Sequence, residues 1–353
     1  MPLPSIPDYS ISIKTPQLVH PAILSGGHPI EKGSNVVKYA GGFCVVFPYQ
    51  TPTHKYAVRC WHAEIADAKK RTQLIAEALK ACNLPYFVGF EYYDDGIMTS
   101  QGKQPVVVMD WVVATPLKKY IAAHLYETNV LLKLAETFKN MVSDLHQHHL
   151  SHGDLQHGNI MVKDDGSLVL VDYDSMYAPT LEGMKDEIKG LQGYQHEARW
   201  ANLYVTEKAD YFSELVIYTS IKALAFLPEL WDELQIEDTD TMIFSADDIK
   251  SSGKASIFNR LRTIPELQPL VNKLCEYMAC HSIEDLSPLE TAVISPIDTI
   301  SSKWGAGNGY TPKPTKVEVD NPNEISQKWG NGNGYQTSSI EHTADVIASA
   351  WKQ

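Results

Sequence analysis

Cysteine is scarce in this chain. Its five cysteines are odd in number and scattered along the sequence, at Cys44, Cys60, Cys82, Cys275 and Cys280. Such a set favours free thiols in a reducing compartment over a disulfide frame or a zinc site. Long apolar runs are missing too, and the N-terminus lacks a basic region followed by an apolar stretch. We therefore expect a cytoplasmic protein without a membrane partner.

Positive charge is also in short supply. Lysine and arginine number 30 against 43 aspartate and glutamate residues, which gives a net charge of −13. Repulsion by phosphates would oppose binding to nucleic acid, so no nucleic-acid partner is expected. The length of 353 residues and the 44% hydrophobic content suit one large two-lobed domain or two ordinary ones.

Two neighbouring stretches carry the chemistry. The first holds Asp154 and Asn159, five residues apart, and the second ends in Asp172, thirteen residues later. They read His152-Gly153-Asp154-Leu155-Gln156-His157-Gly158-Asn159 and Leu168-Val169-Leu170-Val171-Asp172-Tyr173-Asp174. This arrangement is typical of phosphoryl transfer, where one carboxylate receives a hydroxyl proton while an Asn and an Asp hold Mg²⁺.

These stretches resemble the catalytic core of the protein-kinase-like superfamily. His-Gly-Asp stands where His-Arg-Asp is commoner, and Asp172-Tyr173-Asp174 replaces Asp-Phe-Gly. The resemblance implies an α+β, bilobal protein-kinase-like fold that uses ATP and Mg²⁺. It assigns Asp154 as the catalytic base, with Asn159 and Asp172 as the metal ligands. The wording HGDLxxGN is also typical of aminoglycoside and choline kinase relatives.

The pattern along the chain fits that architecture. A small β-rich lobe is expected over residues 33–112, after an extended N-terminal extension at 1–32. Strands are predicted near residues 35–40, 43–47, 56–60, 87–92 and 105–111, with a helix at 62–82. A mainly helical lobe is expected over 113–295, with helices at 117–123, 130–149, 210–226 and within 255–278. A flexible tail follows at 296–353.

The nucleotide site is assigned through the same resemblance. Tyr39 to Val46 resembles a Gly-rich phosphate loop in which Gly41 keeps its register, so Gly41, Gly42 and Val46 are candidate ATP contacts. Tyr56-Ala57-Val58-Arg59 resembles V-A-I-K, which makes Ala57 a further contact and puts Arg59 in the place of the Lys. Lys38 or Lys55 is an alternative cation. Glu77 is the expected helix partner of this cation, in preference to Glu64.

The stretch Val107 to Val112 resembles the strand that leads into the hinge between kinase lobes. Met109 is expected at the back of the nucleotide pocket. Backbone groups around Asp110 and Val112 are expected to bond an adenine edge. The alternative is a buried edge strand without a ligand.

Features around the acceptor side point in two directions. Gln156 supplies no charge where protein kinases often carry a Lys, which leaves room for small-molecule substrates. Glu197 resembles the Glu that ends an activation segment, and Asp210 resembles the buried Asp that bonds the catalytic loop, and both favour a protein substrate. The histidines around 146–157 are interpreted as one structural residue, His152, with the others on a solvated helix end.

The tail repeats one motif. Lys303 to Tyr310 recurs as Lys328 to Tyr335, with Trp-Gly-x-Gly-Asn-Gly-Tyr in both copies. Paired aromatic anchors suggest a bivalent docking tail for a partner protein or the chain's own surface. A duplicated linker without a ligand is the alternative.

Three functions remain open from sequence. The preferred one is an ATP- and Mg²⁺-dependent Ser/Thr protein kinase that resembles an atypical bacterial group. A small-molecule kinase is the second. A pseudokinase that binds partners is the third, favoured by Arg59 and by the incomplete Gly-rich loop.

Overall fold

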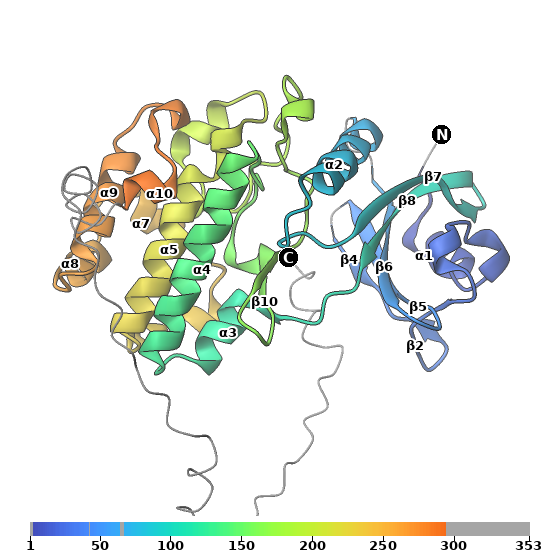
Figure 1. Cartoon of the computed structure of the whole chain (residues 1–353), viewed down its shortest axis with the longest axis horizontal. Helices are drawn as coiled ribbons and strands as arrows, with labels where there is room; N and C mark the ends of the chain where they lie inside the picture. The colour runs from blue at the N-terminus through green and yellow to red at the C-terminus, as the bar shows by residue number, and fades with distance from the viewer. Residues whose placement is uncertain (1–2, 42, 64–66, 294–353) are drawn as a thin grey trace, which may run out of the picture. The chain divides into compact units, whose positions relative to one another are not determined.

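An antiparallel sheet forms the first part of the fold (Figure 1). A computed structural model describes residues 3–41, 43–63 and 67–293 of the chain. The sheet order is β1-β5-β6-β8-β7, and β4 also pairs with β5. The strands are β1 (His28–Pro29), β4 (Tyr39–Ala40), β5 (Cys44–Gln50), β6 (Lys55–Trp61), β7 (Phe90–Thr99) and β8 (Gly102–Asp110). A separate ribbon pairs β2 (Glu31–Lys32) with β3 (Asn35–Val36).

Both faces of this sheet are covered, because its strands are apolar on alternate sides. Val46 and Ala57 join the hydrophobic core that continues into the helical part of the chain. Their neighbours Val45 and Val58 join a second core on the opposite face. The alternation therefore directs Val46 and Ala57 toward the helical part.

The N-terminal residues close that second core, which corrects the expectation of an extended lead-in over 1–32. Ser5 caps helix α1 (Ile6–Ser12) through a capping box with Asp8. Tyr9 is fully buried, and its hydroxyl donates to the Trp61 carbonyl at 2.8 Å. The physical reason is that an otherwise bare sheet face gains apolar cover from α1.

Helix α2 (Ala68–Cys82) is the helix predicted within the first lobe, with a later start than expected. Asn83 ends it in the left-handed conformation, with φ of 49°. Ile75 and Leu79 point into the core, whereas Glu77 lies on the exposed face. The register of α2 therefore determines which of its side chains face the core and which face solvent.

The second part is mainly helical. Its long helices are α4 (Thr128–Gln147), α5 (Tyr211–Phe226) and α9 (Gln268–Met278). Shorter ones are α3 (Leu117–Ala123), α6 (Leu230–Glu233), α7 (Ala246–Lys250), α8 (Ser256–Arg262) and α10 (Leu289–Ala292). A small sheet orders β11 (Leu168–Leu170), β10 (Ile160–Val162) and β9 (Thr115–Pro116). The mixed α+β architecture agrees with a kinase-like fold.

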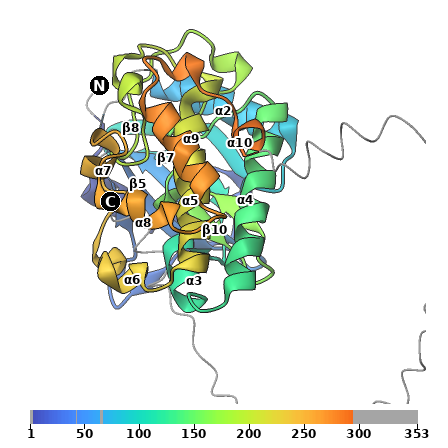
Figure 2. The ribbon, with the colours of Figure 1, turned by 90° about the vertical axis from the view of Figure 1, so that its left-hand side faces the viewer.

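Helix α5 is the central helix of this part. It lies between α4 and α9 in Figure 2. Nearly all its side chains are buried, because the helix is apolar all round. No helix in the described ranges is long and apolar enough to cross a membrane.

His146 joins three helices, which corrects the interpretation of a solvated helix end. Its Nε2 lies 2.8 Å from Glu214 Oε1 on α5, and its Nδ1 lies 2.9 Å from Glu290 Oε2 on α10. Burial alone would lower the pKa of His146. The hydrogen bond and the charge of Glu214, helped by Glu290, outweigh burial and raise this pKa to about 9. The ring is therefore protonated at neutral pH.

This ion pair predicts a pH-dependent stability. Since the folded pKa is about 9 and the ordinary value is 6.5, the stabilisation is fully present below pH 6.5 and is lost as pH rises through 9. We expect His146→Gln to lower the free energy of unfolding by about 2 kcal/mol at pH 6.5 and by much less at high pH. Thermal melts from pH 6 to 10 would measure it. His148→Gln, on the exposed end of α4, is the control, and a pH-independent His146→Gln effect would contradict the assignment.

Candidate active site

A buried carboxylate holds the candidate catalytic loop, residues 152–159, through its backbone. Asp210 is 1% exposed, and it accepts hydrogen bonds from the amides of His152 and Gly153. This confirms the prediction that Asp210 bonds the loop backbone. Gly153 has φ of +78°, and a side chain there would collide with the Ser175 carbonyl. The missing Arg of the commoner His-Arg-Asp therefore has a steric reason in this chain.

Asp154 and Asn159 lie together at the end of this loop. The Asn159 amide donates to the Asp154 carbonyl at 2.8 Å and to Asp154 Oδ2 at 3.1 Å. On the other side, the Leu191 amide donates to Asp154 Oδ1 at 3.3 Å. Burial raises the pKa of Asp154 above its ordinary value. Its carboxylate is thus oriented and made more basic, as a proton acceptor requires.

His152 connects this loop to the segment that carries Asp172. Its Nε2 lies 2.9 Å from the Val171 carbonyl, and its ring is fully buried. Asp172 follows with φ of 65°, a left-handed conformation that is uncommon for Asp. Such strained backbone is characteristic of functional sites. The backbone bends at Asp172, shortly after the end of β11 (Leu168–Leu170), and this bend sets the direction of the Asp172 carboxylate.

The Asp172 carboxylate has capacity for a ligand. Its Oδ1 is buried, and no described residue hydrogen-bonds it. Burial and the nearby charge of Asp174 raise the pKa of Asp172 to about 6. Because Asn159 uses its amide nitrogen on Asp154, its side-chain oxygen is left to accept or to ligate. These two hard oxygens are the donor types that Mg²⁺ prefers, so the residues present fit the ion.

Arg59 is buried beside this carboxylate and pairs with Asp174. Its side chain is 5% exposed, and its guanidinium lies 3.9 Å from Asp172 Oδ1, with a closer ion pair to Asp174. Burial alone would lower the pKa of Arg59, but the two carboxylates outweigh it and raise the pKa above its ordinary value. Asp174 is therefore the main partner of this cation.

This geometry corrects the expected pair between Arg59 and Glu77. Glu77 is exposed, and among the described residues it forms no ion pair. The reason is the register of α2, which turns Arg71 instead toward the site side. Arg71 is buried and donates to the Lys185 carbonyl. The alternative cations also lie elsewhere, since Lys38 is exposed and Lys55 stacks on Trp111 at 3.9 Å.

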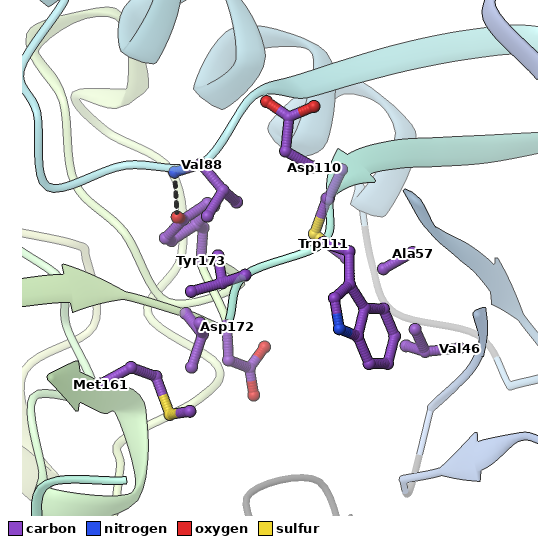
Figure 3. Close-up of a pocket in the computed structure, with 11 residues that line it drawn as sticks. Val46, Ala57, Val88, Asp110, Trp111, Met161, Asp172 and Tyr173 are labelled. Atoms are coloured by element: carbon purple, nitrogen blue, oxygen red, sulfur yellow. Dashed lines mark hydrogen bonds between the residues drawn. The ribbon is translucent and has the colours of Figure 1, made fainter. Parts of the chain in front are cut away.

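Tyr173 fixes the segment between the two acidic residues. Its hydroxyl donates to the Leu170 carbonyl at 2.6 Å and accepts from the Val88 amide at 3.0 Å (Figure 3). The ring is 1% exposed and meets Phe87 and Phe90 edge to face. Tyr173 thus ties the chain before β7 to the Asp172 segment.

A mainly apolar cavity lies next to Asp172 (Figure 3). Val46 and Ala57 line it from the sheet, and Met161 lines it from β10. The full lining is Val46, Ala57, Val88, Met109, Asp110, Trp111, Val112, Met161, Val171, Asp172 and Tyr173. An apolar cavity beside a carboxylate that could hold a metal ion is what a purine nucleotide needs.

The structure brings five of the seven candidate ATP contacts to this cavity. They are Val46, Ala57, Met109, Asp110 and Val112. Gly41 does not line it, and Gly41 lies instead in a turn where its amide donates to the Cys44 carbonyl at 2.9 Å. Gly42 lies outside the described residues, as do both tail motifs.

Of Asp110, Trp111 and Val112, which line the cavity, one residue has a backbone donor to offer. The Trp111 amide donates to the Lys55 carbonyl at 3.1 Å, and the Asp110 amide donates to the Gly89 carbonyl at 3.0 Å. Both are therefore used within the protein. Within the described residues the Val112 amide donates no hydrogen bond, and Val112 lines the cavity. Val112 is accordingly the group that can donate to an adenine edge.

Five of the eleven lining residues were not predicted from the sequence. Trp111 was within reach of prediction, because it stands between the two candidate hinge residues Asp110 and Val112. Met161 lies on β10, the strand that directly follows Asn159. Val88, Val171 and Tyr173 depend on how separate segments meet, and no local pattern specifies this.

The acceptor side is organised by an ion pair that was not expected. Glu197 is exposed, so the resemblance to an activation-segment Glu does not extend to a buried role. Arg199, two residues later, is 1% exposed, and its Nε lies 3.3 Å from Asp186 Oδ2. This pair anchors both ends of the segment between them.

Comparison with known protein families agrees with this geometry. Residues 96–189 match the family model of the ABC1 atypical kinase-like domain. The matched stretch contains Asp154, Asn159 and Asp172, but not Arg59 or the Gly41 turn. No curated protein is similar enough to the chain to count as a match. The match implies a kinase of the protein-kinase-like superfamily that uses ATP, and it leaves the acceptor open.

Proposed function

We propose that the chain is a Mg²⁺-dependent kinase that transfers the γ-phosphoryl group of ATP to a Ser or Thr hydroxyl of a protein. The supporting observation is the placement of Asp172 at the edge of an apolar cavity, with a buried oxygen that accepts no hydrogen bond within the described residues. Asp154 and Asn159 lie hydrogen-bonded on the adjoining loop. Each of the three residues has a distinct task in phosphoryl transfer.

Asp172 and Asn159 would hold Mg²⁺, which neutralises charge on the phosphates when bound. The cavity between Val46 and Met161 would enclose the adenine. Asp154 would take the proton of the attacking hydroxyl. The hydroxyl oxygen then bonds to the γ-phosphorus, and the bond to the β,γ-bridging oxygen breaks to leave ADP. Arg59 lies on the side of Asp172 and would attract the phosphates.

A protein acceptor is favoured by the segment from Ser175 to Asp210. The buried Asp186–Arg199 pair and the Asp210 contacts fix this segment against the catalytic loop. Such a fixed platform suits an extended peptide. The small-molecule alternative draws support from the neutral Gln156 and from the HGDLxxGN motif.

Turnover of radiolabelled ATP tests this proposal. We expect label on a protein acceptor, such as dephosphorylated casein, with Mg²⁺ and none with EDTA. Asp172→Ala should abolish transfer, whereas Asp164→Ala, an exposed Asp in the β10–β11 turn, should behave as wild type. ATP binding followed by thermal shift, without any transfer, would instead indicate the pseudokinase. Label on kanamycin but not on casein would indicate a small-molecule kinase.

A further inference from the structure

Gln195 has a buried donor group without a partner. The residue is 4% exposed, and its Nε2 forms no hydrogen bond within the described ranges. A buried unpaired amide N–H costs free energy, so such a group in a folded protein calls for an explanation. Gln195 lies on the segment that faces the catalytic loop.

The orientation of this amide is set by chemistry. Gln195 Oε1 accepts from Arg199 Nη1 at 2.6 Å. Because a guanidinium can only donate, the oxygen of Gln195 must face Arg199 and the nitrogen must face away. Arg199 is itself fixed by Asp186 and by the Ala209 carbonyl at 3.3 Å. The free end of Gln195 is therefore a donor held by a rigid buried pair.

Gly190 shows where this donor points. A Cβ on Gly190 would lie 2.8 Å from Gln195 Nε2 and 2.6 Å from Asp154 Oδ1. Gly190 therefore lies against both the unpaired donor and the carboxylate that would accept the hydroxyl proton. Gly190 also has φ of +79°, so a side chain is excluded there by conformation as well as by space.

We propose that Gln195 is a specificity-determining residue that donates, through Nε2, to a neutral oxygen of the phosphoryl acceptor beside its attacking hydroxyl. In a Ser or Thr substrate this oxygen is the backbone carbonyl, and in a polyol it is a second hydroxyl. The acceptor would be held at two points, by Asp154 at the reacting hydroxyl and by Gln195 at the neighbouring oxygen. This inference rests on the proposed kinase function.

The Gln195 donor also affects which kind of acceptor can bind beside Asp154. The nearby Gln156 is buried, and its Oε1 has no partner among the described residues. Gln156 lies two positions after Asp154 in the sequence, and Gln195 lies near Asp154 at Gly190. The Gln195 donor favours an oxygen of the acceptor over an ammonium, whose N–H groups would meet this donor with the wrong sign.

The test separates acceptor binding from nucleotide binding. Gln195→Met removes the donor, and Gln195→Glu removes it while keeping an oxygen for Arg199. We expect both to raise the KM for dephosphorylated casein about tenfold, the loss typical of one hydrogen bond. The KM for ATP should change less than twofold. Gln192→Glu, exposed on the same segment, is the matched control. Thermal melts identify any variant that fails to fold.

The outcomes are distinguishable. An unchanged casein KM in a folded Gln195→Glu variant, with wild-type transfer present, would overturn the role of Gln195 alone. An equal rise in the KM for ATP would also overturn it, since that result indicates a general distortion of the site. Failure of the wild-type chain to transfer phosphate to any acceptor would instead refute the kinase proposal and this inference with it. A KM for a neutral polyol such as inositol that rises in the Gln195 variants, where casein is not an acceptor, would support the polyol source.

Discussion

Replacing Asp154 by Asn should lower kcat for phosphate transfer by about 10²–10⁴-fold, the usual contribution of a general base. The Asn keeps the size of the side chain and an oxygen for the Asn159 amide, so the loop is expected to stay in place. The KM for ATP should therefore change little. Steady-state kinetics with labelled ATP measures both constants.

The pH profile supplies a second test of the same residue. Burial raises the pKa of Asp154, and burial with the charge of Asp174 raises that of Asp172 to about 6. Both carboxylates act in the ionised form, so kcat/KM should rise with pH through a limb above the ordinary range of Asp. This limb belongs to the interacting carboxylates together. Asp154→Asn should shift it.

Stability gives the control for this variant. A carboxylate whose pKa is raised on folding destabilises the folded state once it is ionised, so Asp154→Asn should melt no lower than wild type at pH 7. A lower melting temperature with a proportional loss of activity would assign Asp154 a structural role. Full activity in the Asn variant would exclude it as the proton acceptor.

The sequence predicts that the candidate catalytic residues lie close together, because their placement depends on local order. Asp154 and Asn159 lie on one loop, and Asp172 follows β11, which pairs with the strand β10 that begins after Asn159. The spacing alone therefore specifies their proximity. The same holds for Val46, Ala57 and Met109, where strand alternation fixes the face that each side chain takes.

The misses depend on contacts between distant segments. Arg59 and Asp174 are separated by 115 positions, and no periodicity connects them. Helix register decided against Glu77, and register cannot be read from the helix alone when its start is uncertain. Helix α1 was different, because Ser5 and Asp8 form a capping box that the sequence displays. The prolines around Ser5 instead favoured the prediction of an extended segment.

Asp174→Asn should destabilise the folded chain by about 3 kcal/mol, because it leaves the buried guanidinium of Arg59 without its main partner. Asp172, at 3.9 Å, is too distant to replace the lost ion pair. Thermal melts and urea titrations would measure the loss. Glu77→Gln is the matched control, since this exposed carboxylate should change stability by no more than about 0.5 kcal/mol.

A double variant decides between the ion pair and simple packing. Arg59→Met with Asp174→Leu replaces both charges by apolar groups, and such exchanges are often neutral for stability. We expect the double variant to melt well above Asp174→Asn while phosphate transfer stays low, because Arg59 no longer attracts the phosphates. Additive losses would show that the two side chains do not act as a pair. If Glu77→Gln lowered the free energy of unfolding as much as Asp174→Asn does, Glu77 would be the partner of Arg59 after all.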